Sequence, residues 1–396
     1  MLRRIRPSTG ESKSGARRFS DLSETKMLSD LLPGRSNNLN LIRMVAASMV
    51  LVSHAHTIVT GDAANEPLVA QTGEALGKYA VIVFFGISGL LITRSFDRNP
   101  DPLRYLAARV LRLWPGLAMT ALVCMFVIGG MTSTLPAAQY FAETRTYAYF
   151  VDVVTLVKAN STLPGVFAEN PMAHAVNGSL WSLFYEFACY ILVLMLGLLG
   201  LLRRKWVIVA VSAAFLLAFL FFSDWTELGG AWYYLGRFSN TALAFIYGMT
   251  AYTYRESIPV SFKGVVAGWL AVLAISFIVP DTALIYKAAV QLALVYSVFY
   301  LAYVPGGFLL KYNDLGDYSY GMYIFAFPVQ QTLLHYFPAQ GIWENVVFAL
   351  MITLLLAVLS WHFVEQNALK ATNGIVERLE GMMPRAKRVA AVKLDG

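Results

Sequence analysis

The sequence predicts an all-α fold, a polytopic membrane protein with a bundle of about ten transmembrane helices and both termini in the cytoplasm. Three observations carry this prediction. Of the 396 residues, 57% are hydrophobic and only 14% are charged, whereas soluble domains carry roughly 25% charged residues. Apolar runs of spanning length recur along the chain. These runs lack the alternating apolar and polar pattern of barrel strands, so we expect helices that satisfy their own backbone polar groups.

The candidate spans occupy the middle of the chain. We expect them at residues 39–60, 77–93, 114–133, 179–202, 206–223, 231–252, 264–280, 283–304, 318–337 and 345–364. Residues 1–38 are basic and rich in Ser, Gly and Arg, which predicts a disordered cytoplasmic tail. Residues 365–396 predict a cytoplasmic tail that is first amphipathic and then basic. Residues 39–364 therefore form one expected transmembrane domain.

The basic residues predict the orientation of the chain. With both termini in the cytoplasm, 26 of the 31 lysines and arginines lie on the cytoplasmic side, as the positive-inside rule requires. The exceptions are Lys78, Arg145, Lys158 and Lys287 on the other side, and Arg237 within a span. The formal charge of +7 thus reflects cytoplasmic loops, and we expect membrane lipid as a partner and no nucleic acid.

Ionisable side chains within the first span are the strongest functional signal. Arg43 and His54 are eleven residues apart, so they share a helix face and lie about 16 Å apart along the axis. His54 then lies near mid-bilayer, where ionisable residues usually face a bundle interior or a wet cavity. A histidine is a natural general base for a hydroxyl nucleophile, although a snorkelling arginine and a hydrogen-bonded core histidine would also fit. His56 points about 200° away from His54.

The second span carries a glycine-rich element at residues 84–93. Gly86 and Gly89, together with Ser88, would let another helix or an extended ligand approach the backbone closely. Simple helix packing is the more common reason for such a pattern. The cysteines Cys124 and Cys189 both fall in apolar runs, so we expect packing residues and neither a disulfide nor a metal site.

The cytoplasmic stretch of residues 94–115 is rich in arginine. Arg109 and Arg112 are three residues apart and so share one helix face. Arginine forks bind phosphate groups bidentately, which favours a phosphate-bearing ligand. Topology signals or contacts with anionic lipid are the alternative explanation for an unselected basic loop.

Glu186 lies two turns into the fourth span with no basic residue nearby in sequence. It needs a partner from another helix, and His54 and Arg237 are the candidates. In residues 134–178, the longest non-cytoplasmic segment, we expect a partial lid over a cavity.

The last two spans carry a polar element each. At the start of the ninth span, Asp317 or Ser319 would cap the helix, and Tyr320 and Tyr323 could belong merely to the aromatic belt. At the end of the tenth span, we expect Glu365 to end the helix at the membrane interface.

Six of these segments, in this order, closely resemble the acyltransferase 3 family of bacterial integral membrane acyltransferases. The matching elements are R-x10-H at Arg43 and His54, FF-x-x-SG-[FL]-L at 84–91, R-x-x-R-[LI]-x-P at 109–115, SLWSL-x-x-E at 179–186, SY-x-x-Y at 319–323 and F-x-E at 363–365.

The resemblance implies transfer of an acyl group, most often acetyl, from cytoplasmic acyl-CoA to a hydroxyl of an extracytoplasmic glycan. Exopolysaccharide and lipopolysaccharide are such acceptors, and the location implied is the bacterial inner membrane. His54 becomes the general base or an acyl relay, and Arg43 and Glu186 become its electrostatic support. No metal is implied.

The donor-binding residues that the resemblance implies lie at the cytoplasmic face. Arg109 and Arg112 would contact the CoA phosphates, and Ser319 and Tyr320 would line the entrance. A transporter or flippase of a lipid-linked glycan is the rival interpretation, and a structural membrane subunit is a weaker one. Consumption of acyl-CoA separates them, because a flippase only relocates its cargo.

Overall fold

A computed structural model of the chain describes residues 26–34, 36–156, 161–280 and 283–382. These residues are mostly helical and contain almost no strand, which confirms the all-α class. The described residues hold a single sheet, in which β1 (Lys26–Met27) pairs antiparallel with β2 (Pro259–Val260).

The helices follow the order of the sequence prediction. Their bounds are α1 (Leu28–Leu31), α2 (Leu39–Thr60), α3 (Val69–Thr72), α4 (Leu76–Arg98), α5 (Pro102–Leu122), α6 (Gly129–Thr132), α7 (Ala137–Ala142), α8 (Thr144–Val154), α9 (Trp181–Leu198), α10 (Lys205–Phe222), α11 (Gly230–Thr253), α12 (Phe262–Ser276), α13 (Leu284–Tyr303), α14 (Ser319–Tyr336), α15 (Ile342–Ser360), α16 (Gln366–Lys370) and α17 (Thr372–Met382). Short 3-10 helices cover Ala63–Asn65, Ser223–Glu227 and Gly307–Asp314, and π-helical turns cover Val123–Ile128 and Trp361–Glu365.

Seven helices in the described part of the chain are long and apolar enough to cross a membrane. They are α2, α4, α5 continued into α6, α9, α10, α13, and α15 continued into α17. A helix also lies in each of the other three predicted ranges, namely α11, α12 and α14. The chain is therefore a multi-pass membrane protein, while the count of ten spans and the side of the termini stay predictions.

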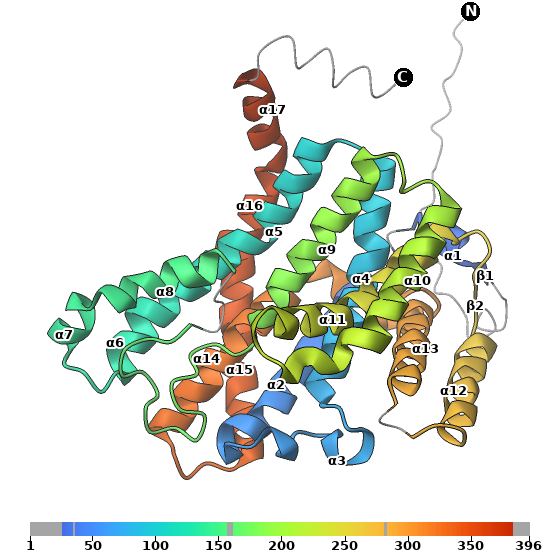
Figure 1. Cartoon of the computed structure of the whole chain (residues 1–396). Coiled ribbons are helices and arrows are strands. Elements are labelled where there is room, and N and C mark those ends of the chain that lie inside the picture. The colour runs from blue at the N-terminus through green and yellow to red at the C-terminus, as the bar shows by residue number, and fades with distance from the viewer. Residues whose placement is uncertain (1–25, 35, 157–160, 281–282, 383–396) are drawn as a thin grey trace, which may run out of the picture.

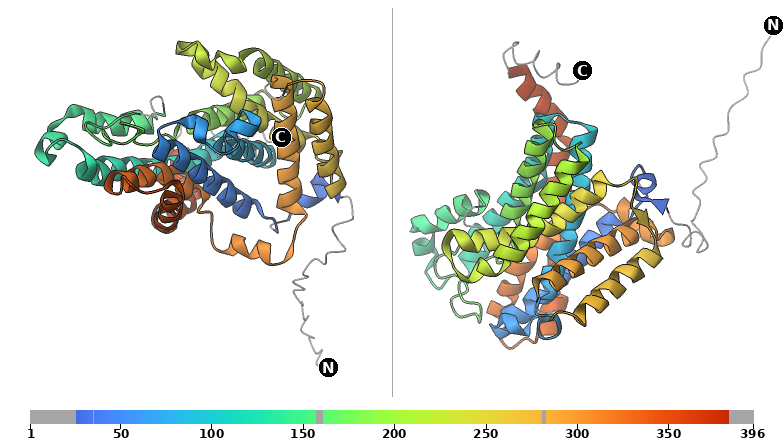
Figure 2. Two further views of the ribbon diagram at one scale, coloured as in Figure 1. Left: turned by 90° about the horizontal axis from the view of Figure 1, so that it is seen from below. Right: turned by 45° about the vertical axis from the view of Figure 1, so that its right-hand side comes forward.

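The long helices form one bundle. In Figure 1 most of them run between the top and the bottom of the view, with α17 at the top and α3 at the bottom, and Figure 2 shows the same bundle from two further sides. In its centre α4 packs against α2 and α11, and α14 packs against α2 and α15. We call the end that carries α17 and the start of α2 the inner end, and the end that carries α3 the outer end.

The glycine-rich element of α4 is a helix-packing surface. A Cβ added at Gly89 would lie 1.9 Å from the carbonyl oxygen of Phe245 on α11, and one added at Gly86 would lie 2.7 Å from Val295 on α13. Such contacts tolerate only glycine, because the absent side chain is what lets the helices approach. The packing interpretation of this element is confirmed.

The structure corrects the predicted N-terminal tail in part. Residues 26–34 are ordered, because β1 pairs with β2 and the apolar side chains of Leu28 and Leu32 are buried in the core. Residues 1–25 and 35 of the predicted tail lie outside the described residues, as does the end of the C-terminal tail, residues 383–396.

The expected lid, residues 134–178, also differs from the prediction in its first half. There α8 packs along α5, and α7 packs against α6 and α8. Tyr140 of α7 donates a hydrogen bond to the carbonyl of Met125, in the π-helical turn after α5, at 2.8 Å, and Trp114 of α5 donates to that of Val154 at 3.0 Å. Buried apolar side chains hold this half against the bundle, so it is not a free lid.

Candidate active site

A cavity of about 600 Å³ lies toward the outer end of the bundle, within the size range of small-molecule sites. His54 of α2, Lys78 of α4, Trp181 of α9 and Arg237 of α11 line it, and residues 172–178 form one wall. His54 therefore faces a cavity, as its depth in the membrane predicts. The second half of the expected lid contributes to that cavity.

His54 makes few polar contacts. Its Nδ1 lies 3.4 Å from the hydroxyl of Ser179 at the start of α9, and the edge of its ring meets Phe327 with the ring centroids 5.3 Å apart. Among the described residues its Nε2 has no hydrogen-bond partner. A neutral imidazole has one donor and one acceptor nitrogen, so a ligand hydroxyl in the cavity could use the remaining nitrogen.

The elements at residues 179–186 and 319–323 hold each other in place beside His54. The hydroxyl of Tyr323 donates to the carbonyl of Ser179 at 2.6 Å and is hydrogen-bonded to Ser182 at 2.6 Å. Asn177 donates to the carbonyl of Ile324 at 2.8 Å. These bonds fix the start of α9 against α14, and with it the Ser179 hydroxyl. Tyr323 is buried in the bundle and is not a residue of the aromatic belt.

A carboxylate that the sequence analysis missed also lies beside His54. Glu66, in the segment between α2 and α4, accepts hydrogen bonds from the hydroxyls of Ser53 and Thr57, the latter at 2.7 Å. It interacts electrostatically with His54 and lines the same cavity. The available signal was the pair of hydroxyl residues four apart that flank His54 on α2.

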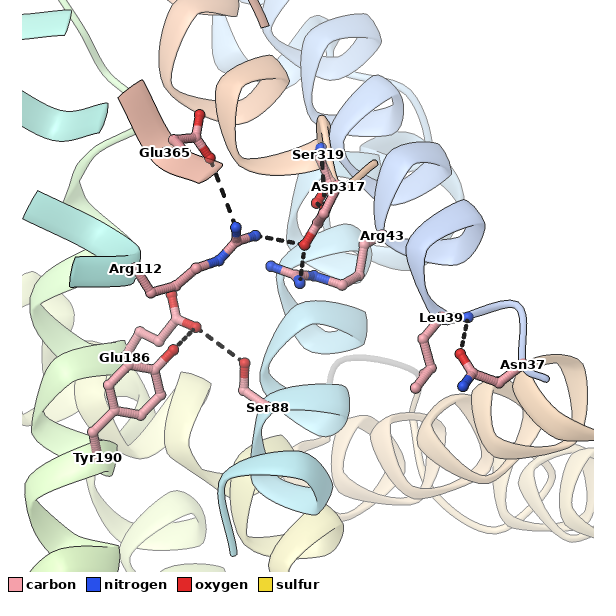
Figure 3. A network of polar contacts seen from close by, with 10 residues as sticks. All are labelled: Asn37, Leu39, Arg43, Ser88, Arg112, Glu186, Tyr190, Asp317, Ser319 and Glu365. Atoms are coloured by element: carbon pink, nitrogen blue, oxygen red, sulfur yellow. Dashed lines mark hydrogen bonds and ion pairs between the residues drawn. The ribbon is translucent and has the colours of Figure 1, made fainter. Parts of the chain in front are cut away.

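A second charged site, the inner ion-pair cluster, lies at the inner end of the bundle (Figure 3). Arg43 Nη1 of α2 and Arg112 Nη2 of α5 donate to the same Asp317 oxygen, at 2.6 Å and 2.5 Å. Arg112 Nη1 also lies 3.7 Å from Glu365 Oε2. The cluster joins α2, α5, the residues just before α14 and the π-helical turn that follows α15.

Asp317 is held as a carboxylate. Burial alone would raise its pKa, but the guanidinium groups of Arg112 and Arg43 and the hydrogen bonds from Ser319 lower the pKa to about 2. Ser319 donates from its hydroxyl at 2.5 Å and from its backbone N–H at 3.3 Å. The N-cap residue of α14 is Tyr318, and no side chain caps the helix, so the capping role predicted for Asp317 or Ser319 is wrong. The sequence analysis also missed the role of Asp317 as an ion-pair partner.

The prediction that Glu365 ends its helix at the membrane interface is wrong. Its side chain is buried, accepts a hydrogen bond from Ser360 at 2.8 Å and faces Arg112. The π-helical turn Trp361–Glu365 lies between α15 and α16, and the helical chain continues to Lys370. Such turns are rare and occur often at functional sites.

Glu186 has partners other than those expected. In the described part of the chain, it pairs with neither His54 nor Arg237. It accepts hydrogen bonds from Ser88 of α4 at 3.0 Å and from Tyr190, one turn further along α9, at 2.5 Å. Glu186 thus links α9 to α4, as Figure 3 shows.

The two arginines predicted to bind phosphate differ in their surroundings. Arg112 is paired with carboxylates and lies 5.6 Å from the ring of Tyr320. Arg109 lies 5.8 Å and 6.0 Å from the rings of Tyr105 and Tyr190, and its buried Nε has no hydrogen-bond partner among the described residues. Arg109 is therefore the arginine with donors left for a ligand.

His56 points away from the cavity. Its Nδ1 lies 2.9 Å from the carbonyl of Val52, and its ring meets Trp343 with the centroids 6.0 Å apart. Cys124 and Cys189 are both buried and form no disulfide. The residues that the structure describes contain no cluster of three or more His, Cys, Asp or Glu that could hold a metal ion.

Comparisons with known proteins agree over most of the chain. Residues 36–364 match the family described as an acyltransferase domain. The chain is similar to the O-acetyl transferase of Shigella phage Sf6, with 31% identity over 352 residues, which cover 85% of this chain and 96% of that protein. It is also similar to nodulation protein 10 of Rhizobium leguminosarum bv. viciae, with 28% identity over 384 residues, which cover 87% of this chain and 96% of that protein. No solved structure matches the chain.

Proposed function

The chain belongs to the acyltransferase family that matches residues 36–364, and on that premise we propose that it acetylates a glycan outside the cytoplasm. Membrane-bound O-acyl transfer itself follows from the family and from the O-acetyl transferase relative. The proposal adds cytoplasmic acetyl-CoA as the donor, a hydroxyl of an exopolysaccharide or lipopolysaccharide as the acceptor, and the bacterial inner membrane as the location.

The observation that carries the proposal is His54 on the wall of the cavity of about 600 Å³. In the proposed step the imidazole takes the proton of an acceptor hydroxyl, whose oxygen attacks the thioester carbonyl. The new ester bond forms, the carbon–sulfur bond breaks, and the CoA thiolate leaves and takes up a proton. In the alternative step, a relay, His54 first accepts the acyl group from CoA and then passes it to the acceptor hydroxyl from the same position in the cavity.

The supporting residues are assigned from their contacts. Ser179, 3.4 Å from Nδ1, and Glu66 orient and polarise the His54 ring. Arg43 and Glu186 are not among the residues that line the cavity. We therefore assign them to the support of the helices that carry the site, through Asp317 and Ser88, rather than to direct contact with the reacting atoms.

On the donor side, the proposal places the CoA phosphates at Arg109. Its unpaired Nε and its position at the inner end support this assignment. The other expected donor contacts, Arg112, Ser319 and Tyr320, each already have a partner within the protein: Arg112 and Ser319 bind Asp317, and Tyr320 donates to the carbonyl of Leu113 at 2.7 Å.

Donor dependence tests this function. The purified protein in lipid vesicles is given labelled acetyl-CoA and surface glycan from a strain that lacks the protein, and the product is examined by mass spectrometry. The proposal predicts that the glycan gains acetyl groups and that free CoA accumulates in equal amount. Movement of glycan across the vesicle without loss of acetyl-CoA would support the rival interpretation, a flippase.

A further inference from the structure

Two cations on the wall of the cavity have no ionic partner in the part of the chain that the structure describes. Lys78 of α4 and Arg237 of α11 both line it, and neither has a carboxylate within ion-pair distance among the described residues. The guanidinium carbon of Arg237 lies 4.1 Å from the ring centre of Trp181 and 5.3 Å from that of Tyr233, whose hydroxyl accepts a hydrogen bond from Nε at 3.1 Å. These aromatic contacts hold the guanidinium without neutralising it.

The two carboxylates of the cavity wall are already engaged elsewhere. Glu74 forms a 3.0 Å ion pair with Lys287, and Glu66 accepts the hydroxyls of Ser53 and Thr57. Lys78 is attracted by Glu74 but repelled by both Arg237 and Lys287. With the neighbouring Lys287, three cations stand against the two acids Glu66 and Glu74, so this part of the cavity favours an anion.

Their position makes these cations costly without an occupant. Arg237 lies about two turns into α11 and is partly buried, and charges at such depth are usually paired or line a path for a ligand. Lys78 lies near the start of α4, so its stem could extend toward the surface, yet its side chain lines the cavity. One binding partner that supplies an oxyanion would satisfy both residues.

We propose that the cavity is an anion-binding acceptor site, in which Lys78 and Arg237 bind a negatively charged group of the molecule that His54 acetylates. The group is either the carboxylate of an acidic sugar or the phosphate of a lipid-linked glycan. Trp181, whose ring already carries the Arg237 guanidinium, borders the same space. The identification of the bound molecule as the acetyl acceptor rests on the proposed function, whereas the anion site itself does not.

Binding of matched probes in detergent tests the site without acyl transfer. Methyl glucuronide is compared with methyl glucoside, and farnesyl diphosphate with farnesol, by calorimetry. At least one anionic probe should bind about tenfold more tightly than its neutral partner, which corresponds to about 1.4 kcal/mol. The preference should disappear in Lys78→Gln and Arg237→Gln. It should persist in Lys78→Arg and in the control Lys263→Gln, which changes an exposed lysine of α12.

The two anionic probes also identify the source of the charge, because a preference only for the glucuronide indicates an acidic sugar and one only for the diphosphate indicates a lipid carrier. Equal binding of anionic and neutral probes by a wild-type protein that elutes as a folded species would overturn the proposal. So would a preference that survives both glutamine variants. Loss of acetyl transfer with this binding intact would instead count against the proposed function alone.

Discussion

The outer cavity and the inner ion-pair cluster both place charges inside an apolar bundle, but the protein neutralises the charges itself only in the cluster. In the cluster, Arg43 and Arg112 share the carboxylate of Asp317, and Glu365 lies beside them. In the cavity, Lys78 and Arg237 have no such partner among the described residues. A charge that the protein neutralises itself is explained by the fold. A charge left facing a cavity calls for a ligand.

The largest expected effect is on chemistry in the outer cavity. Replacing His54 with Ala should lower the acetyl transfer rate by about 10²–10⁴-fold, which is typical of a lost general base, while thermal stability in detergent changes little. His56→Ala is the matched control, because that ring contacts Trp343 outside the cavity, and it should retain the wild-type rate. A His54→Ala protein that transfers acetyl groups at the wild-type rate would remove the distinction between the two regions.

Substitutions in the inner ion-pair cluster should mainly lower the stability of the fold. Asp317→Asn leaves two partly buried guanidinium groups without their shared carboxylate, which should cost up to about 3–5 kcal/mol of unfolding free energy. The exposed Asp314 provides the control, because Asp314→Asn should change stability by less than about 0.5 kcal/mol. Denaturant unfolding in detergent measures both variants. An Asp317→Asn protein of wild-type stability would show that the cluster is not structural.

The lowered pKa of Asp317 determines how the stabilisation of the fold by its carboxylate depends on pH. A carboxylate whose folded pKa is about 2 and whose unfolded pKa is about 3.9 stabilises the fold fully above the unfolded value. The contribution is lost only as pH falls from about 4 toward 2. The stability difference between wild type and Asp317→Asn should therefore stay constant from about pH 8 to about pH 5.

A smaller effect should separate Arg109 from Arg112 on α5. Arg109→Lys keeps the charge but loses the fork geometry that suits a phosphate, so acetyl-CoA should bind roughly tenfold more weakly while stability is kept. Arg112→Lys should instead lower stability, because Arg112 holds Asp317 and Glu365. Calorimetry with acetyl-CoA measures this, with Arg98→Lys, an exposed residue of α4, as the control. If all three variants bound acetyl-CoA as tightly as the wild type, Arg109 would be interpreted as a lipid contact.

Features that depend on local spacing could be predicted from the sequence. The shared face and depth of Arg43 and His54 follow from helix geometry alone, and His54 does face a cavity. The glycines of α4 predicted close packing, and they contact α11. Each of these inferences needs only one helix and the knowledge that it lies in lipid.

Features that depend on partners far apart in the chain could not be predicted. Arg112 and Asp317 are 205 residues apart in sequence, and no periodic pattern links them. The helix α5 also begins well before the predicted span at residue 114, because Asp101 caps it and Pro102 is its first residue. A span predicted from hydropathy ends at a charged residue. The folded bundle nevertheless accommodates Arg112, because acidic groups from other parts of the chain neutralise it. For Glu186 the sequence predicted a charged partner, His54 or Arg237, but its partners are the hydroxyls of Ser88 and Tyr190.

The central claim is that donor and acceptor reach the protein from opposite ends, the donor at Arg109 and the acceptor at the His54 cavity. Sealed vesicles of known protein orientation test it with labelled acetyl-CoA added to one face at a time. We predict that label reaches the glycan only when the donor is supplied at the inner end, where α2 begins, and the glycan at the outer end. Incorporation only with the donor at the outer end would contradict this account of the site.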